Sequence, residues 1–166
     1  MRSSVKIRPA SEADLLAMAE IYNDAVLHTT ATFDTEPRDE ERMRRWYLAH
    51  KPSHPILVAE EDGRVVGWAS LSRWSRRKGY DRTVELSVYV AREHRGRGIG
   101  KALMEGILEE GKRAGFHLVV SRIVEGSDAS LHLHEALGFE RVGVMREAGW
   151  KFGRWLDVHI FQKLLD

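Results

Sequence analysis

An alternating segment that runs directly into a glycine-rich loop and then a helical pattern is the feature that most constrains the fold. Residues 83–90, TVELSVYV, alternate apolar and polar side chains and predict a strand. Glycines follow at positions 96, 98 and 100 among Arg95, Arg97 and Lys101, before the apolar, helix-favouring run at 102–108. Such a loop offers close backbone approach, free N–H groups and the positive end of a helix dipole. The segment therefore predicts a phosphate site.

Two common phosphate loops do not match this segment. A nucleoside-triphosphate loop requires glycine at position 95 and Ser or Thr after Lys101, where the chain has Arg95 and Ala102. A dinucleotide fingerprint counted from Gly98 requires a small residue where Leu103 stands. A plain helix-start loop without a ligand is the remaining alternative.

Length and composition indicate one soluble globular domain, residues 1–166. The chain is 43% hydrophobic and 31% charged with a net charge of +1, so a polybasic nucleic-acid binder is not expected. It has no apolar run of membrane-spanning length and no hydrophobic leader in its first 15 residues, so we expect a cytoplasmic protein without a membrane partner. Because cysteine is absent, disulfides, zinc–thiolate sites and a cysteine nucleophile are excluded.

The hydrophobic patterns predict a mixed α/β (α+β) fold. Helical spacing marks four segments, at residues 12–27, 39–51, 101–115 and 127–138. Strand patterns mark residues 5–10, two runs within 56–74 around the Asp62-Gly63 turn, 82–92, 117–124, 139–145 and 155–165. This order favours a mixed sheet of about seven strands covered by helices.

One face of the strand at 83–90 is unusually polar for the middle of a domain. Its apolar face carries Val84 and Leu86, whereas Glu85, Ser87 and Tyr89 share the other face. Such a face borders either a cleft or open solvent. Its continuation into the loop favours a cleft.

The segment VYVAREHRGRGIGKALM resembles the acetyl-CoA motif of the GNAT superfamily of N-acetyltransferases, through Arg95, Gly98 and Gly100. The segments TTATF, TVELSVYV, LHEALGFERVG and KFGRWLDV resemble its phosphinothricin and methionine sulfoximine acetyltransferase branch. The resemblance covers nearly the whole chain. It implies a GNAT fold, with a mostly antiparallel sheet splayed between its fourth and fifth strands.

The resemblance also implies acetyl-CoA as cofactor and no metal. The pyrophosphate would lie on the glycine loop, and the pantetheine arm would pair with the edge of the fourth strand. The implied cofactor-binding residues are Val88, Tyr89, Val90, Arg95, Gly96, Arg97, Gly98, Ile99, Gly100, Lys101 and Ser127. Ser127 stands where the family usually has asparagine, so its shorter side chain would reach the arm only through water.

Two residues are the implied catalytic groups. Glu85 corresponds to the base that takes the proton of the attacking amine, and His134 to an acid for the departing thiolate. The N–H group of Val88 would hold the oxyanion. Without the resemblance, Glu85 fits an exposed ion pair and His134 a core histidine.

The substrate residues and the partners also follow from the resemblance. The implied substrate-binding residues are Phe33, Trp74, Arg76, Arg77, Lys78 and Glu85, although RWSRRKGY also fits a solvated loop and is more cationic than is typical of the family. The expected activity is acetylation of the α-amine of a small amino-acid-like substrate; the alternatives are another amine, such as a protein N-terminus or an antibiotic, and a non-catalytic acetyl-CoA-binding regulator. We also expect a homodimer, since Trp150, Phe152 and Trp155 cluster near the C-terminus.

Overall fold

The computed structural model of the protein describes residues 4–166. Its strands are β1 (Lys6–Pro9), β2 (Ile56–Glu61), β3 (Arg64–Arg73), β4 (Thr83–Val90), β5 (Leu118–Val124), β6 (Glu140–Lys151) and β7 (Arg154–Leu164). Its α-helices are α1 (Leu15–His28), α2 (Glu40–His50), α3 (Ile99–Arg113) and α4 (Asp128–Ala136). The predicted fold class, with about seven strands and four helices, is confirmed. None of the described helices is long and apolar enough to cross a membrane.

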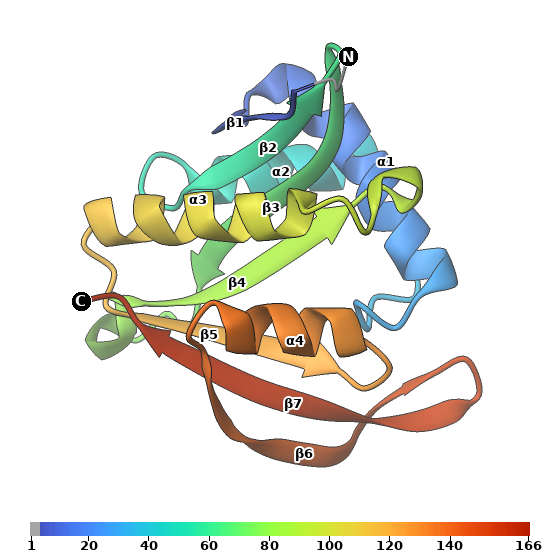
Figure 1. Cartoon of the computed structure of the whole chain (residues 1–166), viewed down its shortest axis with the longest axis vertical. Helices are drawn as coiled ribbons and strands as arrows, with labels where there is room; N and C mark the ends of the chain where they lie inside the picture. The colour runs from blue at the N-terminus through green and yellow to red at the C-terminus, as the bar shows by residue number, and fades with distance from the viewer. Residues whose placement is uncertain (1–3) are drawn as a thin grey trace.

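The strands form one sheet in the order β1-β2-β3-β4-β5-β7-β6, with helices on both faces (Figure 1). Alternation within β2 shows how both faces are buried: Leu57 packs in the core beneath α3, whereas Ile56 and Val58 pack in the core beneath α1 and α2. Trp68 of β3 is 1% exposed in the second core, and its indole N–H donates to the carbonyl of Met18 in α1. Two separate cores therefore hold the sheet from opposite sides.

The pairing of β4 with β5 is parallel and very short. Residues 83–85 pair with residues 118–120, and all the other neighbouring strands pair antiparallel. Beyond Glu85 the two strands separate, so the predicted splay is confirmed. The N–H of Ala91 donates to Val66 of β3, so by alternation the N–H groups of Val88 and Val90 face the opening.

The C-terminal hairpin differs most from its predicted bounds. Strand β6 continues to Lys151, six residues past the predicted end at 145, and pairs Trp150 with Trp155 across a tight turn. Phe152 and Gly153 at this turn both have positive φ, of 51° and 75°. The segment between the two predicted strands, REAGWKFG, has no strand pattern, since it lacks β-branched residues and contains two glycines.

Candidate functional site

A cavity of about 830 Å³ opens where β4 and β5 separate. It passes from the loop before α3, between the two strands, to the α1–α2 side of the sheet. Its lining brings together residues that are far apart in the sequence: Phe33 from the loop after α1, Glu85 from β4, Gly98 before α3 and His134 from α4. The two strands pair over only three residues, so their facing edges beyond Glu85 do not bond to each other and the site lies in this gap.

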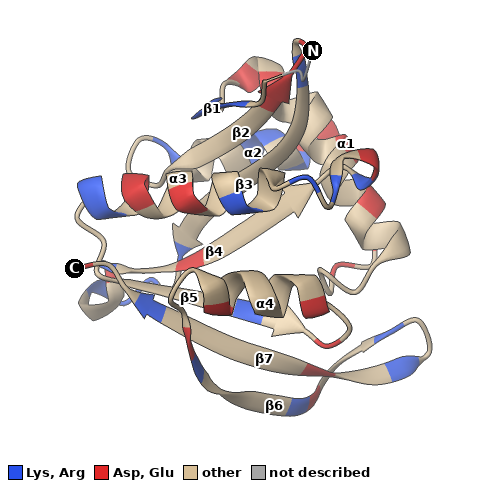
Figure 2. Cartoon of the chain, viewed as in Figure 1, with Lys and Arg blue, Asp and Glu red and all other residues tan. Residues whose placement is uncertain are grey.

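The loop before α3 has the geometry of an anion site. Gly96 and Gly98 have φ angles of +76° and +82°, and a Cβ added at either would meet no protein atom within 4 Å. Gly98 is the N-cap of α3, so the first N–H groups of that 15-residue helix point toward this space without helical acceptors. Basic residues gather along the same loop, coloured blue in Figure 2. The open cradle fits a pyrophosphate.

Most of the predicted cofactor residues lie together around the cavity. Ten of the eleven line it; these are Val88, Tyr89, Val90, Arg95, Gly96, Gly98, Ile99, Gly100, Lys101 and Ser127. Arg97 does not line it among the described residues and instead forms a two-bond ion pair with Glu61, at 2.8 and 3.2 Å. The Ser127 side chain makes no capping hydrogen bond to α4, which leaves its hydroxyl available to a ligand.

Glu85 lies on the cavity wall, and its carboxylate is paired with Arg122 of β5. One carboxylate oxygen accepts from the Nη2 of Arg122 at 2.8 Å and the other accepts from its Nε. This hydrogen bond to Glu85 raises the pKa of Arg122. The polar face of β4 therefore borders a cleft rather than open solvent.

His134 is buried on the opposite side of the sheet, with 5% of its surface exposed. Its Nδ1 lies 2.7 Å from the carbonyl of Ser130, and its Nε2 lies 2.9 Å from the hydroxyl of Ser121. Burial lowers the pKa of His134, which favours the neutral ring. Because a carbonyl only accepts, Nδ1 carries the proton and Nε2 accepts from Ser121. In this geometry Nε2 holds no proton to give directly to a thiolate.

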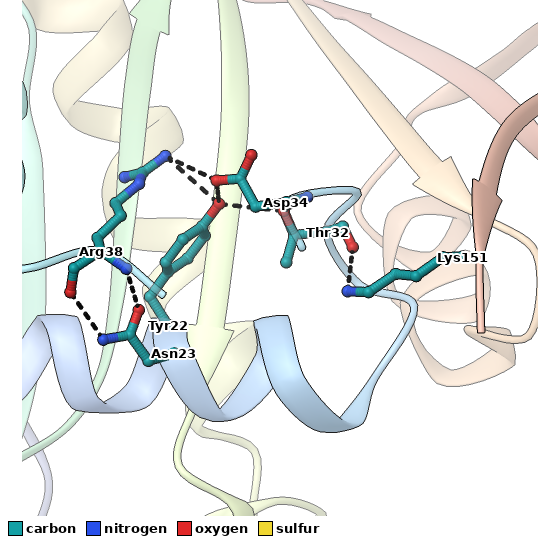
Figure 3. A network of polar contacts seen from close by, with 6 residues as sticks. All are labelled: Tyr22, Asn23, Thr32, Asp34, Arg38 and Lys151. Atoms are coloured by element: carbon teal, nitrogen blue, oxygen red, sulfur yellow. Dashed lines mark hydrogen bonds and ion pairs between the residues drawn. The ribbon is translucent and has the colours of Figure 1, made fainter. Parts of the chain in front are cut away.

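The loop after α1 forms part of the cavity wall and is fixed by polar contacts (Figure 3). Asn23 exchanges two hydrogen bonds with the backbone of Arg38, at 2.8 and 2.9 Å. The Tyr22 hydroxyl donates to Asp34, and the buried Lys151 donates to the carbonyl of Thr32 at 2.7 Å. Helix α1 and the C-terminal hairpin thus hold the segment that carries Phe33.

The predicted substrate residues divide into two groups. Phe33 and Glu85 line the cavity. Trp74 lies beside the cavity residue Arg122, with 5.7 Å between its ring and the guanidinium. The charged side chains of the loop before β4, namely Arg76, Arg77 and Lys78, do not line the cavity in the described chain.

Sequence reasoning missed Arg122, Ser121 and Arg38, which also line the cavity. Arg122 and Ser121 belong to the strand pattern HLVVSRIV, where an arginine next to a serine interrupts a run of apolar residues. That interruption is a signal for a strand edge that borders a cleft. Arg38 lies in an irregular loop, where no periodicity indicates which way its side chain points.

Comparison with known proteins defines the family. Residues 17–139 match the acetyltransferase (GNAT) family. The chain belongs to the GNAT acetyltransferases. This GNAT enzyme is 42% identical over 163 residues to the L-amino acid N-acyltransferase MnaT of Escherichia coli, covering 98% of this chain and 95% of that protein.

Two further relatives extend the comparison. The L-methionine sulfoximine/L-methionine sulfone acetyltransferase of Salmonella typhimurium is 43% identical to this GNAT enzyme over 161 residues, covering 96% of this chain and 94% of the relative. The solved structure of yncA, a putative acetyltransferase from Salmonella typhimurium with its cofactor acetyl-CoA, superimposes with a TM-score of 0.94 at 42% identity, covering 98% of this chain and 94% of that one. The GNAT fold and the acetyltransferase class are thereby established.

Proposed function

We propose that the protein transfers the acetyl group of acetyl-CoA to the α-amine of a small amino acid of the methionine sulfone, methionine sulfoximine or phosphinothricin type. One observation carries this proposal: a single cavity connects the anion cradle at Gly98 with the Glu85 carboxylate on the opposite face of the sheet. Relatives at 42–43% identity are named for acyl transfer to such amino acids, which supports the substrate class.

The residues around the opening fit acetyl-CoA. Gly96 and Gly98 with the first turn of α3 would hold its pyrophosphate, and the outward N–H group of Val90 would pair with its amide-bearing arm. When bound, acetyl-CoA supplies a thioester that an uncharged amine attacks. The N–H of Val88 would also hold the acetyl oxygen as it gains negative charge.

Glu85 is the proposed base. It takes one proton from the acceptor ammonium; the nitrogen then forms the amide bond as the carbon–sulfur bond breaks, and the second proton accompanies the released thiol. The Ser121 hydroxyl lines the cavity and donates its one proton to Nε2 of His134, so its oxygen would accept a hydrogen bond from the S–H of the released thiol. His134 acts in this proposal through Ser121.

A thiol-release assay with mass spectrometry of the acceptor tests the proposed function. The panel comprises methionine sulfone, methionine sulfoximine and phosphinothricin, together with peptides carrying a free N-terminus and aminoglycosides. Turnover with the amino acids and an acetyl mass on their α-nitrogen is the expected result. Turnover with peptides or aminoglycosides alone would contradict the substrate class, and binding of acetyl-CoA without any turnover would identify a regulator.

We also propose a cytoplasmic homodimer, with the C-terminal hairpin in the interface. Trp150, Phe152 and Trp155 are 54–57% exposed on this hairpin, and Val142 and Val144 extend the apolar surface along the edge strand β6. A second copy would cover both the rings and the unpaired edge. Light scattering from micromolar concentration upward should give twice the chain mass of 19.0 kDa. A constant monomer would contradict the dimer.

A further inference from the structure

Arg122 has a free guanidinium edge within the acetyltransferase cavity. It lies on β5 two residues beyond Val120, the last residue of β5 to pair with β4, and its side chain is 51% exposed. Glu85 accepts from its Nε and Nη2 atoms, whereas Nη1 has no acceptor among the described residues. A guanidinium carries five N–H donors in two edges, so one edge stays available to a ligand.

The orientation of this guanidinium is fixed before any substrate arrives. Glu85 holds it through two hydrogen bonds, and the ring of Trp74 lies 5.7 Å from its central carbon. Arginine bound in this way loses little freedom when a second carboxylate binds in the same plane. The open edge of Arg122 is thus preorganised for a planar anion.

The other cations near the cavity are less suitable for this role. Arg38 stacks over Tyr22 at 4.1 Å, and its Nη2 is already engaged with the Tyr22 hydroxyl and Asp34, at 3.4 and 3.5 Å. Lys101 lies at the start of α3, on the side proposed for the pyrophosphate. Arg122 is therefore the exposed cation closest to the proposed base.

We propose that Arg122 binds the carboxylate of the acceptor through its free edge and thereby places the α-amine beside Glu85. This inference rests on the proposed function. In an α-amino acid the carboxylate and the amine are attached to the same carbon. Glu85 already holds the guanidinium of Arg122, so an acceptor carboxylate bound to Arg122 brings the acceptor amine within reach of the Glu85 carboxylate. The positive charge between them also offsets the repulsion between the two carboxylates. Arg122 would then select α-amino acids over amines that lack the carboxylate.

The test compares two acceptors that differ only in this group, methionine sulfone and its carboxamide. In wild type the acid should have a kcat/KM at least about tenfold above that of the amide. Arg122→Met should raise the KM for the acid about 10- to 100-fold, leave the KM for the amide and for acetyl-CoA unchanged, and remove the preference. Arg122→Gln, which keeps a donor for Glu85, should behave in the same way and serves if the Met variant does not fold. Arg113→Met removes a charge on the distant end of α3 and should retain the wild-type preference.

The contrary outcomes are distinct. Equal losses for the acid and the amide would show that Arg122 only supports Glu85, and a raised KM for acetyl-CoA would show that it holds the strands in place; either result overturns the proposal. Wild-type turnover without a preference for the acid also overturns it and leaves the proposed function standing. Wild type that acetylates no amino acid refutes the proposed function and this anchor with it.

Discussion

Replacing Gly149 by alanine should push Phe33 into the cavity. Gly149 lies in β6 beneath the Phe33 ring, and an added Cβ would lie 2.3, 2.5 and 2.6 Å from three ring carbons. Ordinary contact between carbons begins near about 3.4 Å, so the ring must move by about 1 Å. Because the ring packs against buried Val124, Leu156 and Val158 and also borders the cavity, the least costly movement is into the cavity.

The size of the effect follows from two opposing contributions. Overpacking costs about 1–3 kcal/mol, whereas Gly→Ala substitution at an unstrained position returns about 0.4–1 kcal/mol by restricting the unfolded chain. Gly149 does not have a positive φ, so the second contribution applies. The net loss of unfolding free energy is about 1–2 kcal/mol, which for a chain of this size lowers the Tm by about 2–8 °C. The displaced ring should raise the KM for the acceptor by about 10- to 100-fold and leave that for acetyl-CoA unchanged.

Thermal unfolding and steady-state kinetics measure both effects, and the same strand offers a matched control. A Cβ added at Gly143 would meet nothing within 4 Å, so Gly143→Ala should keep wild-type kinetics and lose no stability. Adding Phe33→Ala to Gly149→Ala removes the overlap and should cost less than the two single changes together. Wild-type Tm and acceptor KM in Gly149→Ala would refute the placement of Phe33 over this glycine.

Three further predictions test other parts of the molecule. Glu85→Gln should lower turnover about 10- to 1000-fold near neutral pH, with partial recovery where the free amine is already uncharged; a pH series with calorimetric control of acetyl-CoA binding measures this. Gly98→Val should abolish acetyl-CoA binding by calorimetry, because the side chain enters the cradle and strains a φ of +82°, while circular dichroism should still show a folded protein. The hydrogen bond from Arg8 lowers the pKa of Asp14 in the folded protein. The stabilisation from ionised Asp14 is therefore present above the unfolded pKa of about 3.9 and is lost as the pH falls through the lower folded pKa. Urea unfolding below pH 4 should show a steeper loss of unfolding free energy in wild type than in Asp14→Asn.

Local patterns were sufficient to predict the elements that position the anion cradle. The strand at 83–90, the glycines and the following helix are contiguous, so their mutual placement follows from short-range geometry. The Asp62-Gly63 turn is predictable for the same reason, since both residues adopt positive φ, of 51° and 77°.

Contacts between distant segments could not be predicted in this way. Arg122 meets Glu85 only because β5 runs parallel to β4, and a sequence pattern does not specify the register of that pair. Arg97 shows the opposite case. It lies within the predicted motif, yet its side chain pairs with Glu61 of a separate hairpin instead of lining the cavity. For His134 the resemblance indicated a functional position, but its hydrogen bonds to Ser130 and Ser121 depend on packing that brings α4 onto β5.

The three-residue pairing of β4 with β5 has a mechanical consequence. One half of the molecule is built from β1 to β4 with α1, α2 and α3, and the other from β5, β7 and β6 with α4. Among the described residues the strands of the two halves pair only at Thr83–Glu85 and Leu118–Val120, so the rest of the contact between the halves is made by side chains, as in the core that α3 shares with β5 and β7. A ligand that pairs with the free edge of β4 and also contacts α4 would add hydrogen bonds across this gap, so loading the enzyme should reduce local opening between β4 and β5.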